Sequence, residues 1–184
     1  MLGRIFTEFF TLVETEFGDD MLDVIIEDAE LPNEGAYTAV GNYDDLELIR
    51  LVTALSERTH LDVPDLVKVF GTFIFERFIL IYPKFTENMN DSFTFLSSID
   101  NVIHVEVKKL YPNASLPKFH TYFQDDTLVM IYQSAKNLPD LAEGLIIGAG
   151  KYFNESLIIQ RQLLEDGSTA VSYTHLTLPT NREV

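Results

Sequence analysis

Apolar residues recur every three or four positions through the first 110 residues, which predicts that this part of the chain is mostly helical. The stretch 2–17 has this spacing and is predicted to end at Gly18. Further along, the stretch 30–42 contains one proline and two glycines and is predicted to be a loop. Pro64 suits the first turn of a helix, and Pro83 stops that helix after Ile81. The other helices are predicted at 20–29, 44–58 and 91–110.

After Pro117 the pattern changes to short β-prone segments. Two of them, 118–124 and 127–134, are separated by the Asp-Asp pair at 125–126, which is typical of a hairpin turn. The remaining elements are predicted as a helix at 139–154, a strand at 156–163, a turn at 165–168 and a strand from Thr169. We therefore predict an α+β fold in one domain, residues 1–170, with a helical half followed by an antiparallel sheet carrying one helix.

The last fourteen residues, 171–184, break from the pattern before them. Their sequence VSYTHLTLPT resembles the translated end of a sequencing adapter, so we predict a non-native tail that replaces the authentic end of the last strand. The alternative is a genuine tail of unusual sequence. No function is inferred from Tyr173 or His175 in either case.

Composition and charge narrow the class of function. The chain has 29 acidic and 13 basic residues, a net charge of −16 that repels nucleic acid and anionic membranes. It has no cysteine, which excludes disulfides, thiolate metal sites and a cysteine nucleophile. Glu8 and Glu14 interrupt the first apolar stretch, so we predict neither a signal peptide nor a membrane span and expect a cytoplasmic protein.

The common catalytic motifs are missing from the sequence. No two of the four histidines stand at metal-ligand spacing on one helix, and no H-E-x-x-H, G-x-S-x-G or G-x-G-x-x-G occurs. The run Gly-Ala-Gly-Lys at 148–151 fails as a phosphate loop, because Leu145 replaces the first glycine and Tyr152 the serine or threonine. Its small residues favour close helix packing instead. We predict that the chain is not an enzyme.

One histidine lies at the edge of a predicted core stripe. On the helix at 91–110, His104 is one step, about 100°, from this stripe. The stripe consists of Leu96, Ile99, Ile103, Val107 and Leu110. The position lets the imidazole face a pocket, although a hydrogen-bonded structural histidine is commoner than a ligand at such a site.

Several short motifs occur in a specific order along the chain. They are GRIF at 3–6, Tyr-Thr at 37–38, His104 within IHVEVKKLYPNASLP, Pro117, YQSAK at 132–136 and EGLI at 143–146. From Met1 to about Ala170 this ordered set resembles the H-NOX family, the haem nitric oxide/oxygen binding domains related to the haem domain of soluble guanylate cyclase. Each motif alone would be weak.

The resemblance implies haem b (iron protoporphyrin IX) bound between the helical half and the sheet. His104 matches the axial histidine that is the protein's ligand to the haem iron. Tyr132, Ser134 and Lys136 match the Y-x-S-x-R motif that holds the two propionates. Lysine replaces arginine at the third position, so the charge is kept while the planar fork of donors is lost. We therefore expect a somewhat weaker clamp on the propionates.

The resemblance also assigns residues that shape the haem and its gas-binding side. Ile5 and Pro117 match positions that press on the porphyrin and bend it, whereas the residues alone predict core packing and a strand entry. Leu141 stands where oxygen-binding members carry a tyrosine, and Phe9 and Ile74 occupy two further distal positions. An apolar pocket gives bound oxygen no hydrogen-bond donor, whereas nitric oxide needs little such help. The resemblance thus implies a nitric oxide sensor that excludes oxygen.

In this family, nitric oxide at ferrous haem weakens the iron bond to the axial histidine, and the helix that carries it shifts. Bacterial members typically signal to a histidine kinase or to a cyclic-di-GMP enzyme, a diguanylate cyclase or phosphodiesterase. Two alternatives stay open: a haem-free module that binds a hydrophobic small molecule or protein, and an oxygen-binding haem sensor. His104 and the propionate residues discriminate against the first, and Leu141 against the second.

Overall fold

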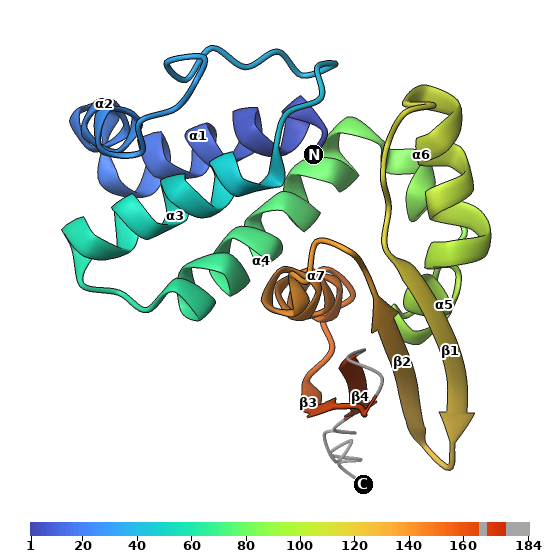
Figure 1. Ribbon diagram of the computed structural model, residues 1–184. Helices are drawn as coiled ribbons and strands as arrows, with labels where there is room; N and C mark the ends of the chain where they lie inside the picture. Colours follow the sequence, from blue (N-terminus) through green and yellow to red (C-terminus); the bar gives the residue numbers. More distant parts are fainter. Residues whose placement is uncertain (166–168, 176–184) are drawn as a thin grey trace, which may run out of the picture.

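The computed structural model describes residues 1–165 and 169–175, and its N-terminal half is helical as predicted (Figure 1). The helices of this half are α1 (Gly3–Phe17), α2 (Asp19–Asp28), α3 (Asp45–Thr59) and α4 (Val63–Ile81). The start of α3 shows how local chemistry sets a boundary. The Asp44 carboxylate accepts the Leu46 N–H at 3.0 Å, and the Glu47 carboxylate accepts the Asp44 N–H at 3.3 Å. This capping box begins the helix at the predicted place.

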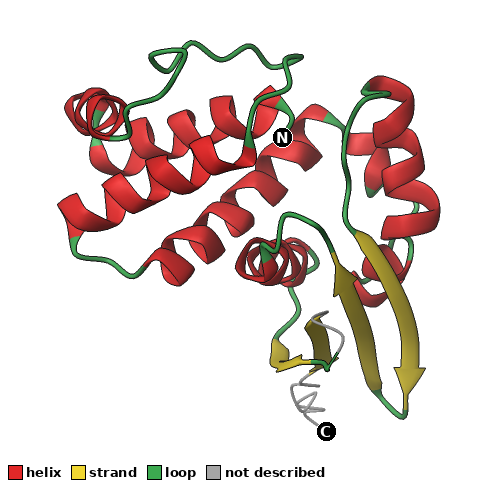
Figure 2. Ribbon diagram, in the orientation of Figure 1, coloured by secondary structure: helices red, strands yellow, loops and turns green. Residues whose placement is uncertain are grey.

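The C-terminal half is an antiparallel sheet with one helix, so the predicted α+β class is confirmed (Figure 2). The elements are β1 (Lys118–Gln124), β2 (Thr127–Gln133), α7 (Pro139–Tyr152), β3 (Leu157–Leu163) and β4 (Thr169–His175). The strand order is β1-β2-β4-β3, so the last strand lies between the hairpin β1–β2 and β3. Asp125 has a φ of 52°, a left-handed conformation that closes the predicted hairpin turn.

The predicted single helix at 91–110 is wrong in its interior. It consists of α5 (Ser92–Ser97), a wider π-helical turn η2 (Ile99–Ile103) and α6 (His104–Leu110), with a short 3₁₀ helix η1 (Pro83–Phe85) before it. The Ser98 hydroxyl donates to the Phe95 carbonyl at 2.6 Å, which competes with the helical pattern at the junction. The Ser98 carbonyl then accepts two amides, those of Val102 and Ile103. Helical periodicity alone does not distinguish such a turn from an α-helix.

The end of α6 also differs from the prediction. Leu110 is 53% exposed, although the apolar stripe placed it in the core. The next residue packs inward instead, because the Tyr111 hydroxyl lies 2.7 Å from the Tyr82 hydroxyl at the end of α4. Burial, together with that hydrogen bond, raises the pKa of Tyr82 to about 12. The C-terminal end of α6 is thus anchored to α4.

Two apolar clusters fill the interior. One joins α1, α2, α3 and the first half of α4, and the other joins the second half of α4, α5, α7 and the sheet. Val171 of β4 is 1% exposed and belongs to the second cluster. No helix in the described ranges is long and apolar enough to span a membrane. Most of the turn predicted at 165–168, and the part of the predicted tail beyond His175, lie outside the described residues.

Helices α4 and α7 approach each other through glycines. A Cβ atom on Gly144 would lie 2.2 Å from the Lys68 carbonyl oxygen, and one on Gly148 would lie 2.7 Å from the Phe75 Cβ. The Thr72 hydroxyl donates to the Gly144 carbonyl at 3.1 Å across the same contact. The close-packing role predicted for the small residues of α7 is confirmed at Gly148. This contact fixes the α7 side of the cavity described below.

Replacing Gly144 by alanine is expected to destabilise the protein by about 1–3 kcal/mol, because backbone atoms of α4 must move to admit the methyl group. Helix propensity alone would predict that Gly144→Ala stabilises the protein, since alanine is more favourable than glycine in a helix interior by about 1 kcal/mol. Urea unfolding of Gly144→Ala and of Lys151→Ala, an exposed position on α7, measures the difference. Equal stability of Gly144→Ala and the wild type would contradict the packing account.

Candidate functional site

An apolar cavity lies between the helical half and the α5–α6 segment with its neighbouring sheet. It holds about 1370 Å³ of atom-free space, its opening to solvent included. Helices α1, α4 and α7 line it with apolar side chains such as Ile5, Phe78 and Leu145. Within the described lining, the residues with polar side chains are His104, Ser115, Tyr132, Ser134 and Lys136. A large apolar cavity with a few polar groups suits a mainly apolar ligand that carries a few charged or coordinating groups.

His104 is the first residue of α6 and follows the π-helical turn directly. Its Nδ1 lies 3.1 Å from an oxygen of Asp100, and its ring centroid is 5.9 Å from that of Phe119 on β1. Burial lowers the pKa of His104 below its usual value, and the hydrogen bond to Asp100 only partly offsets this effect. At neutral pH the imidazole is therefore neutral and has one nitrogen lone pair, which a metal can use.

The polar residues near the end of β2 are poised as hydrogen-bond donors. The Tyr132 hydroxyl oxygen accepts the Leu138 N–H at 3.1 Å, and the Ser134 hydroxyl oxygen accepts the Lys136 N–H at 3.2 Å. Because each oxygen already accepts a backbone proton, its own proton is available for an anionic group. Two hydroxyls and one ammonium suit carboxylates that would otherwise be poorly paired at an apolar cavity.

The Lys136 ammonium is held by a carboxylate from the other half of the molecule. Its Nζ lies 3.2 Å from Asp45 Oδ1, and the N-terminal ammonium of Met1 lies 2.8 Å from the same oxygen. Burial raises the pKa of Asp45, but the two cations outweigh it and keep the pKa below its usual value. Asp45 therefore remains ionised at neutral pH and joins the loop after β2 to the start of α3 and α1.

The structure brings most of the residues singled out in the sequence to this cavity. Ile5, Pro117 and Leu141 line it together with the four polar residues of the family motifs. Phe9 and Ile74 are not among the residues that line it in the structure, and their distal position stays a prediction. Both are buried in the first apolar cluster, because α1 and α4 pack these faces against each other, with Phe9 in edge contact with Phe70.

Three residues that sequence reasoning missed also belong to the site. Ser115 lines the cavity, and its only signal was its place within IHVEVKKLYPNASLP. Asp100 stands four residues before His104, a spacing that brings two side chains together on a helix. No local pattern connects Asp45 with Lys136, because the two lie far apart in the sequence.

The family model described as Haem-NO-binding matches residues 2–161 of this chain. The chain belongs to the H-NOX family. H-NOX domains are haem-based gas sensors and are in general not catalytic. The cavity fits this cofactor, since it combines apolar walls with one imidazole, three hydroxyls and an ammonium.

Solved H-NOX structures agree with this assignment. The Fe(II) unliganded H-NOX protein from K. algicida is 36% identical with a TM-score of 0.90, covering 97% of this chain and 98% of that one. The H-NOX from Shewanella woodyi, in the Fe(II)CO state, is 39% identical with a TM-score of 0.83, covering 100% and 99%. The S. oneidensis protein in the Fe(II)NO state is 24% identical with a TM-score of 0.89, covering 96% and 100%, and shows the shared fold. Comparison with curated proteins gave no match.

Proposed function

We propose that this H-NOX domain holds haem b in the apolar cavity and senses nitric oxide while excluding oxygen. The observation that carries the proposal is a neutral imidazole, His104, in a cavity whose other polar side chains lie on the β2 end and the 114–117 segment. When bound, haem supplies a ferrous iron that takes diatomic gases as ligands. Membership of the family supports the cofactor, and the site geometry supports the roles of single residues.

In this proposal His104 supplies the protein's ligand to iron, through the ring nitrogen that does not contact Asp100. Tyr132 and Ser134 donate their hydroxyl protons to the propionates, and Lys136 adds the positive charge. Ile5 from α1 and Pro117 before β1 line the cavity at the two positions that bend the porphyrin in this family, and they would press on the ring here. A cofactor held in a distorted shape stores strain that a sensor can release.

The preference for nitric oxide rests on the walls that α1, α4 and α7 contribute. Every described residue of these helices that lines the cavity is apolar, with Leu141 at the position of the tyrosine in oxygen-binding members. Bound oxygen carries partial negative charge and requires a donor for tight binding, whereas nitric oxide does not. These helices contribute no side-chain donor to the described lining, so oxygen binding is disfavoured.

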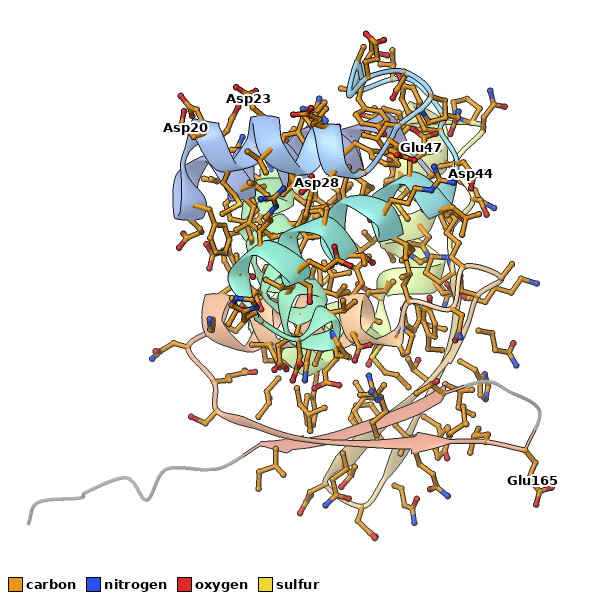
Figure 3. All side chains as sticks on the ribbon, turned by 60° about the vertical axis from the view of Figure 1, so that its left-hand side comes forward. Asp20, Asp23, Asp28, Asp44, Glu47 and Glu165 are labelled. Atoms are coloured by element: carbon orange, nitrogen blue, oxygen red, sulfur yellow. The ribbon has the colours of Figure 1, made fainter. Side chains whose placement is uncertain are left out.

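The partner is proposed to present a basic surface. Exposed carboxylates line α2, and Figure 3 shows Asp20 and Asp23 pointing away from the body of the molecule. Complementary charge speeds association and favours the correct partner. Bacterial members of this family typically signal to a histidine kinase or a cyclic-di-GMP enzyme, a diguanylate cyclase or phosphodiesterase, and we propose one of these here. The sensing unit is proposed to be residues 1–170, with 171–184 a non-native tail.

Anaerobic absorption spectroscopy tests the function directly. The protein expressed with haem is reduced, recorded, exposed to nitric oxide and, in a separate sample, exposed to air. We expect a five-coordinate ferrous spectrum that changes with nitric oxide and does not form a stable oxygen complex. A stable oxygen complex would contradict the gas preference. Folded protein without haem would contradict the cofactor assignment and favour an interaction module instead.

Replacing Lys136 by arginine is expected to slow haem loss several-fold. Arginine adds a planar pair of donors for carboxylates and keeps the charge that pairs with Asp45. Transfer of haem to an excess of apo-myoglobin measures the dissociation rate. Lys151→Arg, on the exposed side of α7, makes the same chemical change away from the cavity and is the control. Equal haem dissociation rates for the wild type and Lys136→Arg would contradict the prediction that lysine holds the propionates less tightly than arginine.

A further inference from the structure

The side chain of His104 is fixed from two directions before any ligand is considered. Its Nδ1 lies 3.1 Å from Asp100 Oδ1, and its ring lies beside Phe119. The two polar side chains differ in accessibility, since His104 is 16% exposed and Asp100 33% exposed. Asp100 is therefore on the outer side of the pair, with His104 between it and the cavity.

The π-helical turn changes the backbone between Asp100 and His104. Asp100 lies within the turn η2, and His104 begins the helix that follows. The His104 N–H bonds to the carbonyl of Ile99, five residues back, where a regular α-helix would use Asp100. The wide turn thus alters the backbone between the two side chains, yet their contact is preserved.

The contact determines which imidazole nitrogen carries the proton. A carboxylate only accepts hydrogen bonds, so the nitrogen facing it must be the donor. In a neutral ring the other nitrogen, Nε2, then carries the free lone pair. A carboxylate behind a ligating histidine also increases the basicity of the ligating nitrogen.

We propose that Asp100 is a positioning residue that holds His104 in the Nδ1-protonated form and makes its Nε2 a stronger ligand for the haem iron. The inference rests on the proposed function, in which His104 binds the iron. It adds a control on the strength of that bond, and hence on how easily a gas bound to the iron weakens it. Asp100 acts through His104 and does not line the cavity.

Two substitutions that each remove one negative charge distinguish this role of Asp100 from the effect of losing any carboxylate near His104. Asp100→Asn keeps the size of the side chain and weakens the hydrogen-bond acceptor. Glu106→Gln makes the same change two residues after His104, at a carboxylate that pairs with Lys109. In the ferrous protein without gas, the iron–histidine stretching band in resonance Raman spectra is expected to shift to lower frequency only in Asp100→Asn. Haem dissociation is expected to become about 10-fold faster in the same variant.

A second measurement requires no variant. In the diamagnetic ferrous carbon monoxide complex, the Nδ1 proton of His104 is expected to exchange slowly with solvent, because it is bonded to Asp100. Exchange as fast as that of free imidazole would overturn the inference. An iron–histidine band that is unchanged in Asp100→Asn would overturn it too, while leaving the ligand role of His104 intact. Absence of any such band from the wild-type protein would overturn both proposals.

Discussion

Replacing His104 by glycine is expected to weaken haem binding by at least about 100-fold, and added imidazole is expected to restore it. Loss of a group that only supports a metal ligand lowers metal affinity roughly 10- to 100-fold. Loss of the ligand itself is therefore expected to lower haem affinity by more. The remaining polar contacts come from Tyr132, Ser134 and Lys136 at the end of β2. Haem titration of the apo-protein, with and without imidazole, gives both affinities.

The matched control is His60→Gly. His60 is exposed and has a φ of 60°, a left-handed conformation that glycine adopts without strain, so this variant should bind haem like the wild type. Haem affinity of His104→Gly equal to that of the control would contradict the ligand role. The imidazole-filled variant also tests signalling, because it would break the proposed tether between iron and α6. An unchanged response of the partner to nitric oxide would show that the tether is not used.

Replacing Leu141 by tyrosine is expected to raise oxygen affinity by about 10- to 100-fold. Leu141 lines the cavity from the first turn of α7, and the described lining residues of α1, α4 and α7 include no side-chain donor. A hydrogen bond to a charged group contributes about 1.5–3 kcal/mol, and each 1.4 kcal/mol is a factor of ten in affinity. Oxygen titration of the ferrous protein, followed by absorption spectroscopy, measures the change.

Leu141→Phe distinguishes the effect of the tyrosine hydroxyl on oxygen affinity from the effect of the aromatic ring. Phenylalanine fills a similar volume without a donor, so oxygen affinity should stay at the wild-type level in this variant. An equal rise in both variants would assign the effect to the shape of the pocket. No rise in either variant, with haem bound normally, would place the control of gas binding elsewhere in the cavity.

Much of the fold was predictable because its signals are local. Apolar spacing, the prolines at helix boundaries and the Asp-Asp turn each act within a few residues, and the structure has these features where predicted. The Asp44 capping box, which the structure shows at the start of α3, is local in the same way. The ordered motifs likewise identified the family, and the family model confirms it. His104, Tyr132, Ser134 and Lys136 were selected by this order, and the structure places all four around one cavity.

The interior of the 91–110 segment was not predictable in the same way. A π-helical turn preserves apolar spacing of four residues, as between Ile99 and Ile103, so periodicity cannot reveal it. The inward position of Tyr111 instead of Leu110 depends on the hydroxyl of Tyr82, which another helix supplies. Such contacts between elements have no local signature.

The sequence by itself determined the order and kind of the elements outside the 83–110 segment, the family, and the residues whose chemistry suits haem. Only the tertiary structure decided which of those residues face the same space. It places Phe9 and Ile74 in the first apolar cluster and outside the described cavity lining, because a helix buries apolar residues against neighbours as readily as against a ligand. It also joined Lys136 to Asp45, and oriented His104 against Asp100. Those pairings depend on where helices and loops meet in three dimensions, which local propensity and periodicity do not encode.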